Sequence, residues 1–112
     1  MYNVDETMYE CPVEALSNIF GKKWVAVIIW TMQDQKMRFG ELQRNIEGCS
    51  KKMLTQQLEL LMENQIIINE KKTFNNSVES TYYLSESGLT LLPIMGKMIK
   101  WSNDNLSCDR YY

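Results

Sequence analysis

Two adjacent lysines, Lys51 and Lys52, carry the most informative chemistry in this sequence. They follow Ser50, a residue type that favours the N-cap of a helix, so both are expected in the first turn of that helix. Cations in a first turn oppose the helix dipole, and helix stability therefore does not explain them. Lysines at this position suit contact with phosphate or guanine, while an ordinary solvated surface is the alternative.

Residues near these lysines extend the same chemistry. Gln56 lies one turn further along the expected helix and has the groups to pair with adenine, and Thr55 suits a thymine methyl group or a phosphate. Arg38, at the entry to the preceding short helix, suits a contact with the nucleic-acid backbone. Asn75 and Asn76 would either reach a minor groove or simply form a turn, and the turn is the favoured interpretation. The candidate DNA-contacting residues are thus Arg38, Ser50, Lys51, Lys52, Thr55, Gln56, Asn75 and Asn76.

The cysteines offer a second kind of chemistry. Cys11 precedes Pro12 at an expected helix start, where the helix dipole favours the reactive thiolate, although Glu10 and Glu14 oppose this effect. Cys11 is therefore a candidate redox sensor, with a buried and inert thiol as the alternative. Weaker candidates, as resolving thiols, are Cys49 and Cys108.

The sequence has no histidine and no pair of cysteines at CxxC spacing. These absences argue against a zinc site, a disulfide framework and catalysis through histidine. Because a Gly-rich phosphate loop and a paired-carboxylate motif are also missing, we expect no catalytic residue, no metal and no cofactor. The longest apolar run, residues 25–30, is too short for a bilayer span, so we expect a cytoplasmic protein with no membrane partner.

The formal net charge of -2 is unevenly distributed along the chain. Residues 1–21 contain four acidic residues and no basic one, whereas residues 22–52 contain seven basic and three acidic residues. A basic segment is what phosphate contact requires, because the release of counterions supplies most of the sequence-independent affinity for DNA. The same residues also suit a solvated face, so charge alone leaves both interpretations open.

The hydrophobic periodicity predicts the elements that position these side chains. Residues 12–20 are expected to form a helix, and residues 22–33 a second one that is apolar almost all round and central in the core. A short amphipathic helix over residues 39–46, a turn at Gly48 and a longer helix after Ser50 have the layout of a helix-turn-helix.

Two segments rich in β-forming residues follow. Residues 66–74 and 81–84, with turn residues at 75–77, predict a hairpin. A final helix begins after Ser85 and is expected to bend or break near Pro93.

The predicted fold is mainly α with a small β-hairpin. We expect a single domain over residues 1–112, a winged helix-turn-helix with additional N- and C-terminal helices. Residues 1–10 are polar and acidic and are predicted to be a loose N-terminal arm.

The ordered motifs resemble the HxlR-type winged helix-turn-helix transcription regulators of bacteria, a branch close to the MarR regulators. The matching segments run through residues 11–93 in the family's order: CPVEALSNIFGKKW, RFGEL, SKKMLTQQLELL and YYLSESGLTLLP. The resemblance implies a homodimer, paired through its terminal helices, that binds a pseudo-palindromic operator of double-stranded DNA with one recognition helix of each subunit in a major groove. Some members of the family sense electrophiles or oxidants through the cysteine of the Cys-Pro start, here Cys11.

Two positions depart from the family pattern. Where the family commonly carries a proline-rich turn and an arginine in the wing, this chain has Ser77, Val78 and Glu79. Glu79 would repel phosphate, which argues against contact between the wing and a minor groove. Cys49 replaces the usual aliphatic residue before Ser50, which would place a thiol close to the DNA-facing side.

These observations predict a DNA-binding transcriptional regulator, a repressor rather than an activator, and not an enzyme. The alternative is a winged helix that serves protein–protein contact and has weak or no DNA binding, which Glu79 and the acidic total charge favour. No motif identifies the operator sequence or a small-molecule inducer.

Overall fold

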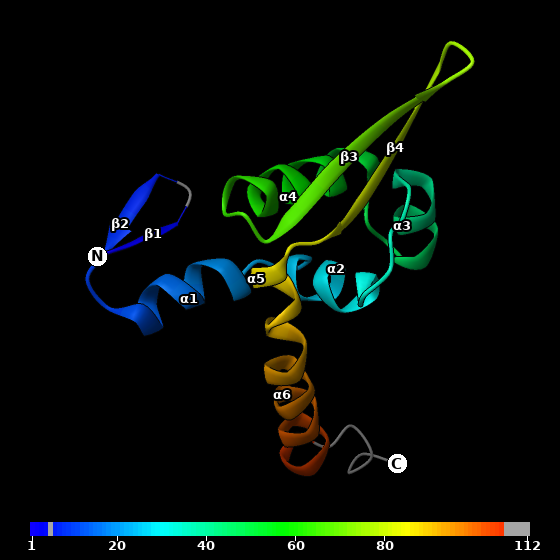
Figure 1. Cartoon of the computed structure of the whole chain (residues 1–112). Helices are drawn as coiled ribbons and strands as arrows, with labels where there is room; N and C mark the ends of the chain where they lie inside the picture. The colour runs from blue at the N-terminus through cyan, green and yellow to red at the C-terminus, as the bar shows by residue number, and fades with distance from the viewer. Residues whose placement is uncertain (5, 107–112) are drawn as a thin grey trace.

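The structure is a computed structural model and describes residues 1–4 and 6–106. These residues form a winged helix-turn-helix with additional helices before and after it. Helices α3 and α4 and the β3–β4 hairpin lie together in Figure 1, and α6 extends away from them. The elements follow in the order β1 (Tyr2–Val4), β2 (Thr7–Tyr9), α1 (Pro12–Phe20), α2 (Val25–Met32), α3 (Phe39–Asn45), α4 (Lys51–Glu63), β3 (Ile67–Phe74), β4 (Ser77–Leu84), α5 (Glu86–Leu89) and α6 (Leu91–Asn105).

Helix α2 lies at the centre of the core. Its buried side packs against α3, α4, the β3–β4 hairpin and α6. The prediction that this helix is central in the core is confirmed, although its outer side is not covered, since Val27 and Trp30 are 42% and 38% exposed. A domain of this size has too few elements to cover a helix on every side. The most deeply buried side chains of the core are Val25, Ile28, Ile29, Met32, Leu42, Ile46, Leu54, Leu58 and Leu61.

The predicted helix-turn-helix is confirmed in α3, α4 and the turn between them. The Oγ of Ser50 accepts a hydrogen bond of 3.1 Å from the backbone N–H of Met53, so Ser50 caps α4 as expected. Gly48 has a φ of +82°, a backbone conformation that favours glycine and lets the chain reverse between the two helices.

The wing is a two-stranded antiparallel hairpin that projects beyond the helices in Figure 1. Phe74 pairs with Ser77 at its end, which leaves Asn75 and Asn76 as a two-residue turn. Both turn residues have positive φ, 46° and 69°, as a type I′ turn requires. This turn continues the strand ladder directly, so β4 begins at Ser77 rather than at residue 81 as the sequence predicted.

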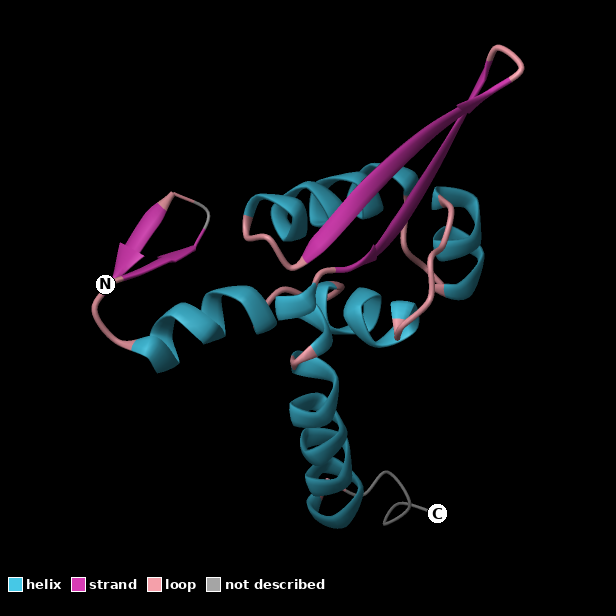
Figure 2. Cartoon of the chain, viewed as in Figure 1, coloured by secondary structure: helices cyan, strands magenta, loops and turns pink. Residues whose placement is uncertain are grey.

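The predicted break in the C-terminal helix is confirmed, and it falls between α5 and α6. Pro93 has no N–H to donate to the carbonyl of Leu89, and its ring would collide with that carbonyl in a continuous helix. The chain therefore ends α5 at Leu89 and begins α6 at Leu91, which puts Pro93 in a first turn, where no donor is needed. Figure 2 shows α6 starting beside α5 and extending away from the other elements.

The N-terminal residues differ from the expected loose arm. Strands β1 and β2 pair antiparallel, with Tyr2 opposite Tyr9 and Val4 opposite Thr7, and they contact α1. Val4 is buried, which gives this small hairpin an anchor. The segment contains few β-forming residues among its polar and acidic ones, so its composition did not predict this pairing.

Gly88 provides a test of how the wing is joined to the C-terminal helices. A Cβ at this position would lie 2.2 Å from the carbonyl oxygen of Ile66, which also accepts a 2.9 Å hydrogen bond from the N–H of Ser85. Gly88→Ala must push these backbones apart, and we expect a loss of about 2 kcal/mol or more in the free energy of unfolding. Urea denaturation followed by circular dichroism measures this loss.

Gly96→Ala is the matched control, because a Cβ there meets nothing within 4 Å. Alanine within a helix is favoured over glycine, so this variant should be as stable as the parent or slightly more so. Equal stability of the two variants would contradict the close approach at Gly88.

Candidate nucleic-acid interface

The exposed face of α4 presents positive charge in its first turn. Lys51 and Lys52 are both exposed, and neither forms an ion pair with any carboxylate in the part of the chain that the structure describes. Because cations at a helix N-terminus are unfavourable for the helix itself, an unpaired pair of lysines there calls for an external anion. Both lysines lie in the first turn, as the sequence predicted, and their contact with DNA stays a prediction.

Ser50, Thr55 and Gln56 surround the two lysines. The hydroxyl of Thr55 donates a 2.8 Å hydrogen bond to the carbonyl of Lys51, so its methyl group and its oxygen lone pairs remain for a partner. Ser50 uses its oxygen as an acceptor in the cap and keeps its proton to donate. Gln56 is exposed, and its amide has no hydrogen bond among the described residues. The structure thus brings these candidates together at one end of α4.

Acidic residues occupy the other end of the same helix. Glu59 and Glu63 are exposed in the second half of α4, where negative charge is again unfavourable for the helix dipole. Both halves of the helix therefore carry charge of the sign that costs stability. The N-terminal end of α4 thus carries positive charge, and its C-terminal half carries negative charge.

The segment of residues 36–38, which we call the strap, runs from α2 to α3 along strand β4. Met37 and Tyr82 exchange two backbone hydrogen bonds of 2.9 and 2.7 Å. Next to them, the Nζ of Lys36 lies 3.2 Å from the Oε1 of Glu70 and 5.0 Å from the ring centroid of Tyr83. The strap thus joins the helix-turn-helix to the wing through backbone and side chains together, and the sequence interpretation had placed Lys36 only in a loop.

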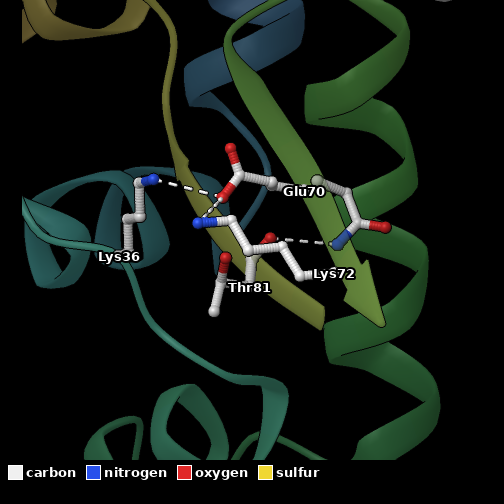
Figure 3. Close-up of polar contacts among 5 residues, drawn as sticks. Lys36, Glu70, Lys72 and Thr81 are labelled. Atoms are coloured by element: carbon white, nitrogen blue, oxygen red, sulfur yellow. Dashed lines mark hydrogen bonds and ion pairs between the residues drawn. The ribbon is translucent and has the colours of Figure 1, made fainter. Parts of the chain in front are cut away.

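Glu70 is held between two cations, as Figure 3 shows. The hydrogen bond from Lys36 is the main cause that lowers the pKa of this carboxyl group; loss of solvent contact opposes it, and the charges of Lys36 and Lys72 add to the lowering. The Nζ of Lys72 lies 3.4 Å from the same Oε1. Asn69, the residue before Glu70, donates a 3.0 Å side-chain hydrogen bond to the backbone carbonyl of Thr81, which links β3 to β4.

Arg38 is not the free cation that its sequence position suggested. Its guanidinium forms an ion pair with Glu79 of β4, and its backbone N–H donates a 3.2 Å hydrogen bond to the Oε1 of Glu41 in the first turn of α3. The two partners of the ion pair lie far apart in the sequence, so no local signal could reveal it. Glu79, noted only as a departure from the family pattern, is therefore part of this surface.

The tip of the wing combines the two asparagines with apolar side chains. Asn75 and Asn76 form the turn, as the favoured interpretation held, and any contact with a minor groove stays a prediction. Phe74 and Val78 beside them are exposed large hydrophobic residues that the sequence analysis did not single out.

The two cysteines within the described residues have different environments. Cys11 is exposed immediately before α1, at the N-cap position. Cys49 is 6% exposed, and burial raises the pKa of its thiol. Its Sγ lies 3.7 Å from the carbonyl oxygen of Ser50, and Cys49 belongs to the cluster of buried core residues. Cys108 lies outside the described residues.

Two further searches cover the described residues alone. Residues 1–4 and 6–106 contain no group of three cysteine, aspartate or glutamate side chains placed to hold a metal ion. Over the same residues, no helix is long and apolar enough to cross a membrane.

Comparisons of sequence relate the chain to known regulators. A family model described as HxlR-like helix-turn-helix matches residues 19–110. A protein of Fusobacterium mortiferum that is named as a regulatory protein, MalR, is 37% identical over 99 residues, covering 87% of this chain and 92% of that protein. The HTH-type transcriptional regulator YodB of Bacillus subtilis is 32% identical over 95 residues, covering 83% of each.

Comparisons of structure agree with those of sequence. The redox regulator HypR in its reduced form is 32% identical and superimposes with a TM-score of 0.80, covering 91% of this chain and all of HypR (100%). The reduced form of YodB is 29% identical, with a TM-score of 0.78 over 90% of this chain and 97% of YodB. The winged helix-turn-helix fold predicted from the sequence is thereby confirmed.

The environments of the two described cysteines predict different reactivity. Alkylation by iodoacetamide requires the thiolate, which burial disfavours at Cys49, whereas Cys11 is open to solvent. At a pH near 8 we expect Cys11 to be alkylated at least about tenfold faster than Cys49 in the folded protein. Mass spectrometry of peptides from timed reactions measures the two rates, and denaturation with urea should make them similar. Equal rates in the folded protein would contradict the burial of Cys49.

Proposed function

This chain belongs to the HxlR-like helix-turn-helix family of transcriptional regulators, and we propose that it is a repressor that binds a pseudo-palindromic operator as a homodimer. The observation that carries the proposal is the exposed and unpaired Lys51 and Lys52 in the first turn of α4. Such regulators are not enzymes, so we assign no catalytic residue. A protein that blocks a promoter by occupying it would work in the cytoplasm and needs no cofactor.

In this proposal α4 is the recognition helix and its N-terminal half enters the major groove. Lys51 and Lys52 contact phosphate or guanine, Gln56 pairs with adenine, and Thr55 meets a thymine methyl group or a phosphate. Ser50 donates its remaining proton to the DNA backbone next to the helix start. Asn75 and Asn76, at the end of the wing, would lie against the neighbouring groove.

Exposed apolar side chains on the terminal helices support the homodimer. They lie on α1 and along α6, which stands clear of the core in Figure 2. An exposed apolar surface of this extent marks a site of protein contact, and a second copy of this chain would cover it. Two recognition helices held in this way would match the two half-sites of an operator. The apolar residues concerned are Val13, Leu16, Ile94, Met98, Ile99 and Trp101.

We propose Cys11 as the sensor of oxidants or electrophiles. Its thiol is exposed, and it lies at the start of α1, beside the surface proposed for the dimer. Among the relatives, HypR is described as a redox regulator, and YodB has been solved in diamide-treated and quinone-bound forms. A reaction at Cys11 would change the distance between the two recognition helices and release DNA. A small ligand between the helices is the alternative route to the same change, and the inducer is not identified.

Replacing Lys51 and Lys52 with alanine tests the assignment of α4. We expect the double variant to lose at least about tenfold in affinity for DNA from upstream of its own gene, about 1.4 kcal/mol, while its folded state is no less stable than that of the parent. Fluorescence anisotropy of a labelled duplex measures the affinity.

The matched control removes two lysines from α6, as Lys97→Ala with Lys100→Ala, and should retain most of the affinity because this helix extends away from α4. Equal losses in both double variants would show that only total charge matters. Wild-type protein that binds no DNA, or that binds a protein partner without dependence on salt, would favour the alternative role in protein–protein contact.

Replacing Cys11 with serine tests the sensor. Diamide removes two hydrogen atoms from two thiols as they join in a disulfide, so the reaction needs a second cysteine of the dimer. We expect Cys11→Ser to bind DNA as the parent does and to keep that binding after diamide treatment, whereas the parent loses it. Cys49→Ser is the comparison and should still respond. A Cys11→Ser protein that still releases DNA would move the sensor to another thiol.

A further inference from the structure

We propose that Glu79 withholds Arg38 from the DNA backbone and so lowers the sequence-independent part of the affinity for DNA. The inference rests on the proposed DNA binding and adds a residue that sets its strength. The carboxylate of Glu79 forms an ion pair with the guanidinium that would otherwise meet a phosphate. Glu79 thus occupies the place of an external anion.

The strap keeps Arg38 within reach of Glu79. Met37, the residue before Arg38, is fixed to Tyr82 by two backbone hydrogen bonds, and Tyr82 lies in the same strand as Glu79. The N–H of Arg38 is bound to Glu41, which fixes the backbone on the other side. Because the backbones of both partners are held, the two side chains stay within reach of each other.

The hairpin leaves Glu79 without a cation of its own. Lys72 is the residue directly across the two strands from Glu79. The Nζ of Lys72, however, lies 3.4 Å from the Oε1 of Glu70, and Figure 3 shows it turned toward that carboxylate. Among the described residues, Arg38 is therefore the cation paired with Glu79.

The pair changes what DNA meets at this edge of the surface. A free Arg38 would add one phosphate contact and release one counterion, which is the source of sequence-independent affinity. The pair of Arg38 and Glu79 has no net charge. A phosphate that binds Arg38 must displace the carboxylate of Glu79 and also come close to its negative charge. The side chains of Arg38 and Glu79 are 58% and 35% exposed, so the pair is weak and screened by salt. It therefore competes with phosphate without excluding it.

The opposite arrangement is that Glu79 orients Arg38 toward DNA and helps binding. The two possibilities predict opposite changes in DNA affinity when the carboxylate is removed. Affinity rises if Glu79 withholds Arg38, and it falls if Glu79 orients Arg38 toward DNA. They also differ in salt dependence, since loss of an oriented contact lowers the number of counterions released, whereas a freed arginine raises it.

Glu79→Gln decides between them, because glutamine keeps the shape of the side chain and loses its charge. The probe is a fluorescein-labelled duplex of random sequence, titrated at salt concentrations between about 50 and 200 mM. At the low end we expect Glu79→Gln to bind about threefold or more tightly than wild type. We expect the slope of log affinity against log salt to become steeper by about 0.9 for each Arg38 that gains a phosphate.

Two control variants separate this effect from a general gain of charge. Glu86→Gln makes the same charge change in α5, at the opposite end of the hairpin from its turn, and should leave affinity and slope near wild type. Arg38→Ala with Glu79→Gln should show no added counterion release, because the freed cation is gone. Circular dichroism and urea denaturation confirm that each variant is folded.

Each result bears on a different claim. An unchanged or weaker complex with Glu79→Gln, or an equal gain with Glu86→Gln, would overturn the role given to Glu79. A gain that persists in the double variant would show that Glu79 acts directly on phosphate and not through Arg38. If wild type binds no duplex even at low salt, the proposed function itself fails, and the inference fails with it.

Discussion

Two backbone hydrogen bonds between Met37 and Tyr82 set the position of the helix-turn-helix relative to the wing. Met37 belongs to the strap that enters α3, so these bonds hold the start of α3 beside β4. Backbone bonds of this kind persist when salt screens side-chain charges. The ion pairs of Lys36 and Arg38, on either side of Met37, are partly exposed, so salt screens the attraction within them. The frame of the surface is therefore stable, whereas its charge distribution responds to conditions.

Helix α4 keeps an unfavourable charge order because its other face holds it in place. Burial of each of its core leucines contributes about 2 kcal/mol, whereas a cation in the first turn costs about 0.3–1 kcal/mol. The cap from Ser50 adds about 1 kcal/mol more. The packing of one face thus exceeds the electrostatic cost on the other. The first turn is left free to carry the residues that a polyanion would bind. The core leucines of α4 are Leu54, Leu58, Leu60 and Leu61.

Local signals in the sequence predicted most of the fold. The cap at Ser50 and the break before Pro93 depend on interactions within a few residues, so they can be read from the chain. The strap could not be predicted, because nothing near Met37 indicates a partner in β4. For the same reason the sequence indicated Arg38 as a contact with the DNA backbone and gave no sign of its ion pair with Glu79. The residues at the start of α4 could be predicted from the sequence, but the ion pair between Arg38 and Glu79 near them could not.

The acidic net charge of -2 does not conflict with DNA binding once the pairing of charges is known. Along the strap and hairpin, Glu70 is paired with Lys36 and Lys72, and Glu79 is paired with Arg38, so two carboxylates offset part of the charge of three cations. Lys51 and Lys52 in the first turn of α4 have no carboxylate partner among the described residues, and there side chains would meet base edges as well as phosphates. Under the proposed function, paired cations give the protein less affinity for phosphate than free cations would. More of its affinity then depends on contacts at the recognition helix, and these are the contacts that distinguish one DNA sequence from another.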